Sequence, residues 1–266
     1  MQNLKITTIQ TNIIWENSQK NINRYETQYL SKLNSGETDL ILFPELFTTG
    51  FTMNTKAYSE KMNGPTITWM QHWAQKLDTQ IGGSIIIKEN NAYYNRFVIV
   101  SKNRIECFYN KNHLFRMGDE NNHFTKGKDR VIHTLKGWNL LLQVCYDLRF
   151  PVFSRNQIIN SEKEYDALLY IANWPEVRSE IWSTLLRARA IENQAYCIGL
   201  NRIGKDAHDI SHSGNSALIT PWGKVTQLKP SQEHMLTFTL KKSILNNINQ
   251  KFPAYLDSNA FKITDN

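Results

Sequence analysis

The sequence predicts an α/β fold, because segments with strand character alternate with segments that show the helical repeat from one end of the chain to the other. Several strand-like segments are continuous apolar runs, which is typical of strands that are covered on both faces. In the middle of the chain, short polar turns join neighbouring strand-like segments, which indicates antiparallel pairing. We therefore expect a sheet that is mixed.

The first part of the chain predicts strand, helix, strand, helix. Residues 4–9 have strand character, and a helical repeat follows that ends at Ser35-Gly36. The repeat is made by Ile22, Tyr25, Tyr29 and Leu33. The apolar run 40–43 before Pro44 predicts a short buried strand. A second helix is expected to begin at Gly64-Pro65, because proline is favoured in the first turn of a helix.

The middle of the chain predicts a meander of paired strands. Residues 80–87 and 92–100 have strand character and are separated by Asn90-Asn91, a pair suited to a tight hairpin turn. A further turn is expected at Asn103-Arg104, with another strand after it.

The second half returns to alternation. Buried strands are expected at 138–145 and 165–171, a helix from Ser179, and a strand at 195–200. The apolar positions of that helix follow a helical repeat, Ile181, Leu185, Ala188 and Ile191. After a polar loop, 215–219 and 235–240 predict two more strands, with a turn at Pro221-Trp222-Gly223.

A single domain over 1–266 is the expected organisation. The length of 266 residues suits one α/β unit with an ample core, and no linker, internal repeat or low-complexity tract divides the chain. The tail from about residue 252 has no clear period, and we expect it either to pack on a partner subunit or to fray.

Composition argues against several classes of function. The net charge of +7 is scattered, and the densest basic cluster, 126–130, is interrupted by Asp129, so nucleic acid is not an expected partner. No stretch approaches eighteen apolar residues and no signal peptide is recognisable, so neither membrane insertion nor export is expected. Three cysteines outside any disulfide spacing favour a reducing cytoplasm.

Three polar residues stand at the ends of predicted strands. Cys145 follows the apolar run 140–144, Glu45 follows 40–44, and Lys111 follows the strand-like segment 105–109. Each one taken alone has a plainer interpretation, an inert buried thiol for Cys145 and surface charges for the other two. Because strand ends in α/β sheets gather at one edge, the three together predict a site that contains a thiol, a carboxylate and an amine.

At these positions the sequence resembles a known family. The segments Phe43-Pro44-Glu45-Leu46, 109–114 and 144–151 are similar, in order and spacing, to the three catalytic motifs of the nitrilase superfamily of carbon–nitrogen hydrolases. Segments 111–117, 171–175 and 187–194 look most similar to the omega-amidases. The resemblance implies an α-β-β-α sandwich, a homodimer or larger homo-oligomer, and no metal or organic cofactor.

The resemblance also implies roles for these residues. Cys145 is expected to attack an amide and form a thioester, with Lys111 favouring the thiolate and Glu45 accepting the proton. Lys111 and the backbone N–H of Tyr146 are expected to form the oxyanion hole. Glu45 then protonates the departing ammonia and activates water. A second glutamate, Glu120, is expected to orient Lys111, with the neighbouring Asp119 as the alternative.

The expected substrate is a small dicarboxylate monoamide, such as 2-oxoglutaramate, which reacts with water. Its free carboxylate would be bound by Arg178, with Trp174 and Phe51 forming the walls of the pocket. Asp147 and Arg149 match the turn that follows the nucleophile in the family, and hydrogen bonding within that loop is the role expected for both.

Four alternatives remain open at this point. The first is an N-carbamoyl amine or aliphatic amide hydrolase with the same three residues. The second is a nitrile hydrolase, which the subfamily motifs favour less. A papain-like protease would use Cys145 with His113. A non-catalytic interaction protein could keep the fold without the chemistry. The set Cys107, His113, His123 and Cys145 has no closely paired zinc-ligand spacing, so a metal site is not expected.

Overall fold

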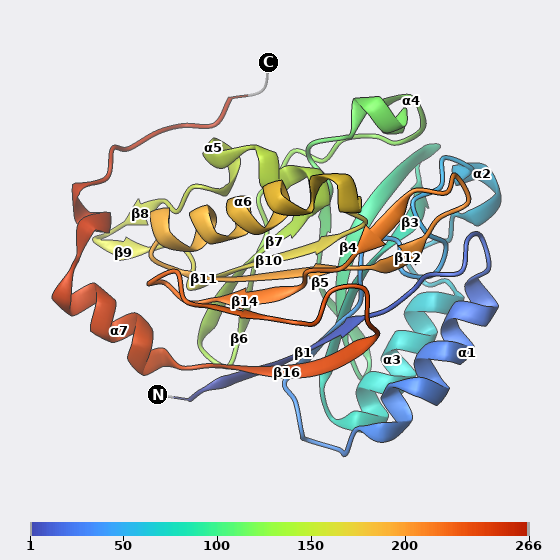
Figure 1. Cartoon of the computed structure of the whole chain (residues 1–266), viewed down its shortest axis with the longest axis horizontal. Helices are drawn as coiled ribbons and strands as arrows, with labels where there is room; N and C mark the ends of the chain where they lie inside the picture. Colours follow the sequence, from blue (N-terminus) through green and yellow to red (C-terminus); the bar gives the residue numbers. More distant parts are fainter. Residues whose placement is uncertain (1, 265–266) are drawn as a thin grey trace.

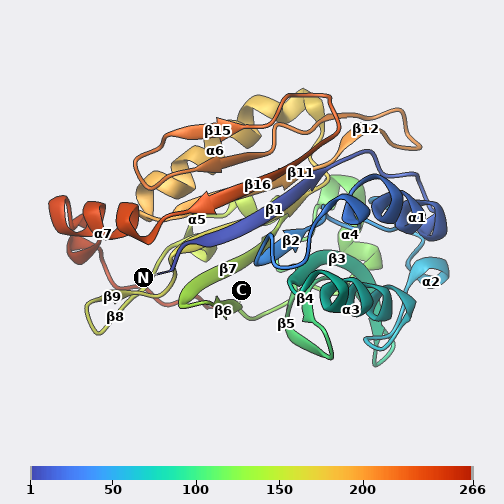
Figure 2. The same cartoon turned by 90° about the horizontal axis from the view of Figure 1, so that it is seen from below.

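The computed structural model, which describes residues 2–264, consists of two six-stranded sheets packed face to face, with helices on the outer face of each sheet (Figures 1 and 2). The helices α1 (Ser18–Gln28) and α3 (Pro65–Leu77) cover the first sheet, and α6 (Ser179–Glu192) covers the second. This arrangement is an α-β-β-α sandwich, so the fold expected from the sequence is confirmed.

The first sheet has the strand order β16-β1-β2-β3-β4-β5. β1 pairs in parallel with β2, and β2 with β3, while the outer pairs are antiparallel. Its strands are β1 (Leu4–Gln10), β2 (Leu40–Leu42), β3 (Gln80–Glu89), β4 (Ala92–Ser101), β5 (Arg104–Asn110) and β16 (His234–Leu240).

The second sheet has the order β15-β14-β11-β10-β7-β6 and is also mixed, with a parallel centre formed by β7, β10 and β11. Its strands are β6 (Ile132–Leu135), β7 (Trp138–Val144), β10 (Ala167–Ala172), β11 (Tyr196–Asn201), β14 (Ala217–Ile219) and β15 (Val225–Gln227). Two small hairpins are formed by β8 (Ile158–Ile159) with β9 (Glu162–Lys163), and by β12 (Ile203–Lys205) with β13 (Ser211–Ser213).

Short helical segments connect these elements. The α-helical ones are α2 (Thr55–Tyr58), α4 (Glu120–His123), α5 (Pro151–Ser154) and α7 (Lys242–Lys251). The 3₁₀ turns are η1 (Leu30–Lys32), η2 (Arg116–Gly118), η3 (Cys145–Arg149), η4 (Glu176–Arg178) and η5 (Ala254–Asp257). Within residues 2–264, none of the helices is both long and apolar enough to span a bilayer.

Alternation along the central strands explains the layers. On β2, Leu40 and Leu42 belong to the apolar cluster between the two sheets, whereas Ile41 belongs to the cluster beneath α1 and α3. Successive side chains of a strand point to opposite faces, so a fully apolar strand can contribute to both clusters. This is why the run 40–43 shows no alternation of apolar and polar residues in the sequence.

Two details differ from the sequence-based expectation. The first helix ends at Gln28, because the backbone of Tyr29 leaves helical geometry (φ −127°, ψ −65°), and a 3₁₀ turn follows. The second concerns α6, whose face on the sheet is formed by Trp182, Leu186 and Ala190. In the repeat at 181, 185, 188 and 191, Ile181 and Ile191 are exposed on the outward face, whereas Leu185 and Ala188 are half-buried and Leu185 packs against the edge of the core.

The predicted hairpin at Asn90-Asn91 is confirmed. Both residues have positive φ angles, 48° and 64°, as a tight turn between β3 and β4 requires. The chain after Phe252 lies against its own domain at Gln194, whose amide donates to the Phe252 carbonyl (2.7 Å) and accepts the Tyr255 N–H (3.0 Å). Packing of this tail on a partner subunit stays a prediction.

Candidate active site

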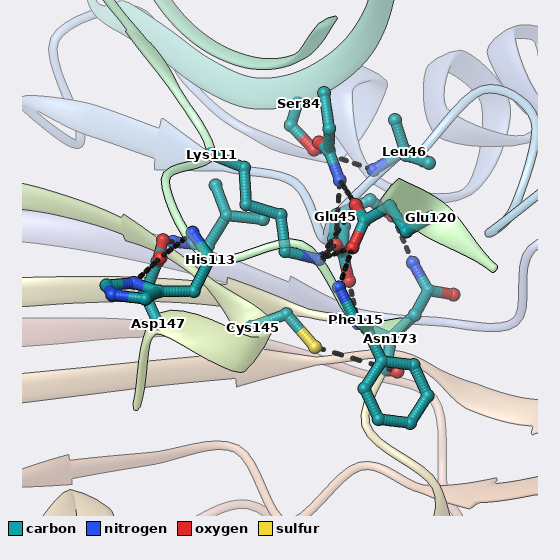
Figure 3. A network of polar contacts seen from close by, with 12 residues as sticks. Glu45, Leu46, Ser84, Lys111, His113, Phe115, Glu120, Cys145, Asp147 and Asn173 are labelled. Carbon is teal, nitrogen blue, oxygen red and sulfur yellow. Dashed lines mark hydrogen bonds and ion pairs between the residues drawn. The ribbon is translucent and has the colours of Figure 1, made fainter. Parts of the chain in front are cut away.

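The two sheets bring the carboxyl ends of four strands to one place. Glu45 follows β2, Lys111 follows β5, Cys145 follows β7 and Asn173 follows β10. Figure 3 shows these side chains gathered around the Lys111 ammonium. The residues predicted from three separate strand ends therefore lie together, and all of them are buried.

Lys111 lies between two carboxylates. Its Nζ atom is 2.8 Å from Oε1 of Glu45 and 2.9 Å from Oε2 of Glu120, and the side chains of all three are fully shielded from solvent. Glu120, rather than Asp119, is thus the second carboxylate at Lys111. Asp119 is exposed and bonds instead to Asn122 and His123.

Neutral donors complete the cluster. The Asn95 amide donates to Oε1 of Glu45 (2.8 Å) and more weakly to Oε1 of Glu120 (3.3 Å), and the Phe115 N–H donates to Oε2 of Glu120 (2.6 Å). On the other side, the Asn173 N–H donates to Oε2 of Glu45 (2.8 Å). Buried charges are tolerated only when they are paired and hydrogen-bonded, and each carboxylate here meets that condition.

These contacts set the charge states of the cluster. Burial lowers the pKa of Lys111, but Glu120 and Glu45 outweigh burial and raise the pKa above its usual value. Burial raises the pKa of Glu120, an effect that the Lys111 charge opposes and the Glu45 charge reinforces. Lys111 therefore stays an ammonium, and two carboxylates compete for it.

Cys145 occupies a strained position at the point where β7 turns into η3. Its φ angle is +47°, a conformation that costs a residue other than glycine about 1–3 kcal/mol and is found mainly at functional sites. The Sγ atom is 3.8 Å from the Asn173 carbonyl oxygen, its hydrogen-bond partner. The turn therefore aims the thiol at the end of β10.

The thiol is protonated at rest. Burial raises the pKa of Cys145 well above its usual value, the Glu45 charge raises it further, and the Lys111 charge lowers it. The expectation that Lys111 favours the thiolate is right in direction, but burial and Glu45 outweigh it. A thiolate can therefore form only together with transfer of its proton to another group.

A cavity of about 870 Å³ opens beside Cys145 and Lys111. The three residues expected to bind substrate, Phe51, Trp174 and Arg178, all line it. The Phe51 ring centre lies 5.1 Å from Nζ of Lys111. Tyr146, the next residue after Cys145, lines the cavity as well, whereas its backbone role stays a prediction.

Two arginines line the cavity above aromatic rings. The Arg178 guanidinium lies 5.5 Å from the Phe115 ring centre, and the Arg149 guanidinium lies 5.5 Å from the Trp174 ring centre. Arg149 was expected to bond within its loop, yet it is exposed and borders the cavity. Its position on the ring of Trp174, a residue from another strand end, explains the difference.

Sequence reasoning missed several residues of the site. Asn95 lies within β4 and directly before Arg96, and two polar residues in the middle of a predicted strand were the only signal. Two segments that gave no motif also line the cavity, the loop after β1 with Trp15 and Glu16, and the β12–β13 hairpin with Asp206, His208 and His212. Burial and the Arg202 charge lower the pKa of His212 to about 4, so this imidazole is neutral at pH 7.

His113 is not arranged as the base of a Cys–His pair. Its Nδ1 atom is 2.8 Å from Oδ1 of Asp147, and its ring stacks on Phe150 at 3.8 Å. In Figure 3 the His113 ring and the Cys145 sulfur point to opposite sides. In the part of the chain that the structure describes, no three His, Cys, Asp or Glu side chains are placed to hold a metal ion.

Comparison with known proteins places this geometry in context. The sequence model of the carbon–nitrogen hydrolase family matches residues 5–246. The chain is 40% identical over 262 residues to omega-amidase YafV of Yersinia enterocolitica, covering 98% of this chain and 99% of that one. It is 31% identical over 223 residues to 2-oxoglutaramate amidase of Bacillus subtilis, covering 83% and 84%.

Solved structures give the same result. A CN-hydrolase superfamily protein from Xanthomonas campestris, which carries an arsenic adduct in its active site, matches with a TM-score of 0.95 and 35% identity. The match covers 99% of this chain and 100% of that one. Saccharomyces cerevisiae Nit3, a member of the nitrilase superfamily, has the same fold, with a TM-score of 0.82 at 21% identity and 95% coverage of both chains.

The charges around Cys145 predict opposite effects of two substitutions on thiol reactivity. Glu45→Gln removes a charge that raises the pKa of Cys145, so alkylation by iodoacetamide at pH 8 should become faster. Lys111→Met removes the charge that lowers the pKa, so alkylation should become slower. Below the pKa, the thiolate fraction changes about tenfold for each unit by which the pKa moves.

The measurement is the alkylation rate of Cys145 by mass spectrometry across pH 6–10. Glu16→Gln is the control, because Glu16 lines the cavity but is not among the groups that shift the pKa of Cys145. Slower alkylation of Glu45→Gln than of the wild type would contradict this account of the site's electrostatics.

Proposed function

Because this chain belongs to the carbon–nitrogen hydrolase family, we propose that it is an amidase that hydrolyses the terminal amide of a small dicarboxylate monoamide, such as 2-oxoglutaramate, to the acid and ammonia. One observation carries the proposal: Cys145 lines a cavity together with Lys111, the ammonium of a buried carboxylate–ammonium–carboxylate cluster. A nucleophile, a proton acceptor and a fixed positive charge are the groups that acyl transfer requires.

Acylation begins with transfer of the thiol proton. Because the Cys145 thiol is protonated at rest, attack on the amide carbonyl requires a base, and Glu45 is the carboxylate whose charge acts most strongly on the thiol. As the C–S bond forms, negative charge moves to the carbonyl oxygen. The Lys111 ammonium, with the backbone N–H of Tyr146, stabilises that charge.

Glu45 serves both half-reactions. Once protonated, it donates its proton to the departing amine, so that ammonia leaves and a thioester on Cys145 remains. The regenerated carboxylate then removes a proton from water, which attacks the thioester and releases the acid and the free thiol. Its bonds to Lys111 and to the Asn173 N–H keep the Glu45 carboxylate in one place during both steps.

Glu120 acts on Lys111 and not on the substrate. It is fully buried and does not line the cavity, and its carboxylate is engaged by Lys111, Asn95 and the Phe115 N–H. With Glu45 it holds the ammonium between two negative charges. We infer that Glu120 keeps Lys111 charged and oriented when Glu45 becomes neutral during the reaction.

The charges of the cavity support a substrate with a free carboxylate. Lys111 is engaged by Glu45 and Glu120, which leaves Arg178 and Arg149 as the cations nearest the cavity walls formed by Phe115 and Trp174. A guanidinium matches the geometry of a carboxylate with two parallel hydrogen bonds. The names of the relatives, omega-amidase and 2-oxoglutaramate amidase, support the same class.

The first test compares ammonia release from 2-oxoglutaramate by the wild type, Cys145→Ala and Arg178→Ala. Cys145→Ala should lose turnover. Arg178→Ala should raise KM about 10- to 100-fold with a smaller change in kcat, since a hydrogen bond to a charged group contributes about 1.5–3 kcal/mol. Arg187→Ala, an exposed arginine of α6 that does not line the cavity, is the matched control.

Two outcomes would count against parts of the proposal. Undiminished activity of Cys145→Ala would rule out the thioester mechanism. An unchanged KM in Arg178→Ala would contradict only the proposed contact between Arg178 and the substrate carboxylate. Assays with N-carbamoyl amines and uncharged aliphatic amides would then identify the substrate class.

We further propose that the protein is a cytoplasmic homodimer. Its three cysteines are free, as thiols are in a reducing compartment. The outward face of α6 carries exposed Ile181 and Ile191, and Val177 and Val152 are exposed on the neighbouring segments η4 and α5. Several exposed apolar residues on neighbouring segments support a subunit interface on this side of the molecule.

Sedimentation equilibrium tests the dimer. The wild type should have twice the chain mass of 31.0 kDa at micromolar concentration. The double substitution Val177→Asp with Ile181→Asp should shift the equilibrium toward the monomer, because dimerisation would then bury two unpaired charges of each subunit in the interface. Phe108→Asp, at an exposed aromatic residue of β5 on the edge of the other sheet, is the control, and a wild-type monomer would refute the dimer.

A further inference from the structure

Asp147 forms a hydrogen-bonded junction between the Cys145 turn and the Lys111 loop. Its carboxylate is fully buried and accepts four hydrogen bonds. Oδ1 accepts from the backbone N–H of His113 (3.0 Å) and from its Nδ1 (2.8 Å). Oδ2 accepts from the Tyr109 hydroxyl (2.8 Å) and from the backbone N–H of Val144 (2.9 Å).

These four bonds use the full capacity of the carboxylate, which has about four acceptor positions. The Nδ1 atom of His113 must carry its proton, because an ionised carboxylate can only accept. Burial and the Asp147 charge raise the pKa of Tyr109 well above its usual value, so its hydroxyl also stays a donor. Asp147 does not line the cavity, and it has no acceptor position left for a substrate.

The donors come from both sides of the site. Val144 is the last residue of β7 and directly precedes Cys145, so its bond to Asp147 closes the turn that contains the nucleophile. Tyr109 and His113 flank Lys111 at positions −2 and +2. One carboxylate therefore ties the backbone beside the thiol to residues on both sides of Lys111, the Tyr109 hydroxyl and the backbone and ring of His113.

The Cys145 conformation makes this connection necessary. Its φ angle of +47° is unfavourable for a residue with a side chain, and it persists only where surrounding contacts fix it. Lys111 is fixed independently, by Glu45 and Glu120. Without the Asp147 bonds, the thiol could move relative to an ammonium that stays in place.

We propose that Asp147 is a positioning residue that sets the placement of the Cys145 thiol relative to Lys111, and thereby the rate at which an amide acylates the thiol. The inference rests on the proposed amidase function. Asp147 is not among the groups whose charge shifts the pKa of Cys145, so its effect is on geometry and not on ionisation.

The distinguishing test compares two reactions of the same thiol. Acylation by an amide requires the thiol and the Lys111 ammonium at the correct positions relative to each other, because the thiol attacks the carbonyl carbon while negative charge develops on the carbonyl oxygen. Alkylation by iodoacetamide forms an S–C bond with loss of iodide and needs no oxyanion partner. A change in geometry should therefore slow the first reaction much more than the second.

Asp147→Asn keeps the size of the side chain but replaces one carboxylate oxygen with an NH₂ group. Each oxygen accepts two hydrogen bonds, and an NH₂ group can accept neither of them. We expect kcat for 2-oxoglutaramate to fall about 10²-fold, the typical effect of a misplacement near 1 Å, while KM and the alkylation rate of Cys145 change only a few-fold. Tyr109→Phe removes one of the four donors to Asp147, together with the acceptor of the Asn112 N–H (3.1 Å), and should change kcat in the same direction by a smaller factor.

Asp166→Asn is the matched control. Asp166 Oδ2 accepts from the Asn139 N–H (3.0 Å) near the start of β7 and from Lys242 Nζ (2.6 Å), so it anchors the opposite end of the same strand. This variant should lose thermal stability and keep the wild-type kcat. An equal loss of kcat in both variants, or equal slowing of hydrolysis and alkylation in Asp147→Asn, would overturn the inference.

If Asp147→Asn does not fold, Tyr109→Phe provides the test. The quantity to compare is the ratio of kcat for amide hydrolysis to the alkylation rate of Cys145. A ratio equal to that of the wild type contradicts the inference, and a lower ratio supports it. The wild type in the same assay separates the two proposals. If the wild type and Asp147→Asn hydrolyse the amide equally fast, only the role of Asp147 is contradicted. If the wild type hydrolyses no amide, both the proposed function and this inference are contradicted.

Discussion

The buried ion cluster of Lys111 with Glu45 and Glu120 is the interaction on which the site depends. Two carboxylates and one ammonium are removed from water together, which is tolerated only because each carboxylate also accepts hydrogen bonds from neutral donors. Removing one partner of a buried ion pair typically costs about 3–5 kcal/mol, because the remaining charge is left uncompensated. Such a cluster therefore holds its members in one geometry.

The sandwich supplies what this cluster needs. Parallel pairing at the centre of both sheets directs the ends of β2, β7 and β10 to one edge, and β5 ends at the same edge although its neighbour β4 runs the other way. The sheets pack through apolar side chains such as Leu42 and Leu142, so water is excluded below the site. In that setting burial and the Glu45 charge keep the pKa of the Cys145 thiol well above its usual value, so the resting thiol keeps its proton.

The sequence predicts the centre of the site better than its surroundings. Glu45, Lys111 and Cys145 each follow an apolar or strand-like run, and a strand end is a local feature that can be recognised without a structure. The roles of Asn95 and Asn173 depend on which strands become neighbours, and no local pattern records that. The loop that carries Trp15 and the β12–β13 hairpin that carries His212 had no motif for the same reason.

Burial was also hard to predict. The helical repeat at 181, 185, 188 and 191 is real, yet a second apolar set, Trp182, Leu186 and Ala190, faces the sheet. A period identifies an apolar face but cannot tell which of two faces is inside. Likewise the sequence shows that a lysine is near the thiol, but the balance between its charge, Glu45 and burial depends on distances and depth.

The central claim is that Cys145 carries a thioester formed with release of ammonia. The most direct measurement is the intact mass of the protein, quenched in acid during turnover of 2-oxoglutaramate. We expect a species heavier than the free protein by the mass of the substrate less one ammonia, located on the peptide that contains Cys145 and absent from Cys145→Ala. Turnover without such a species, or an adduct on any other residue, would contradict it.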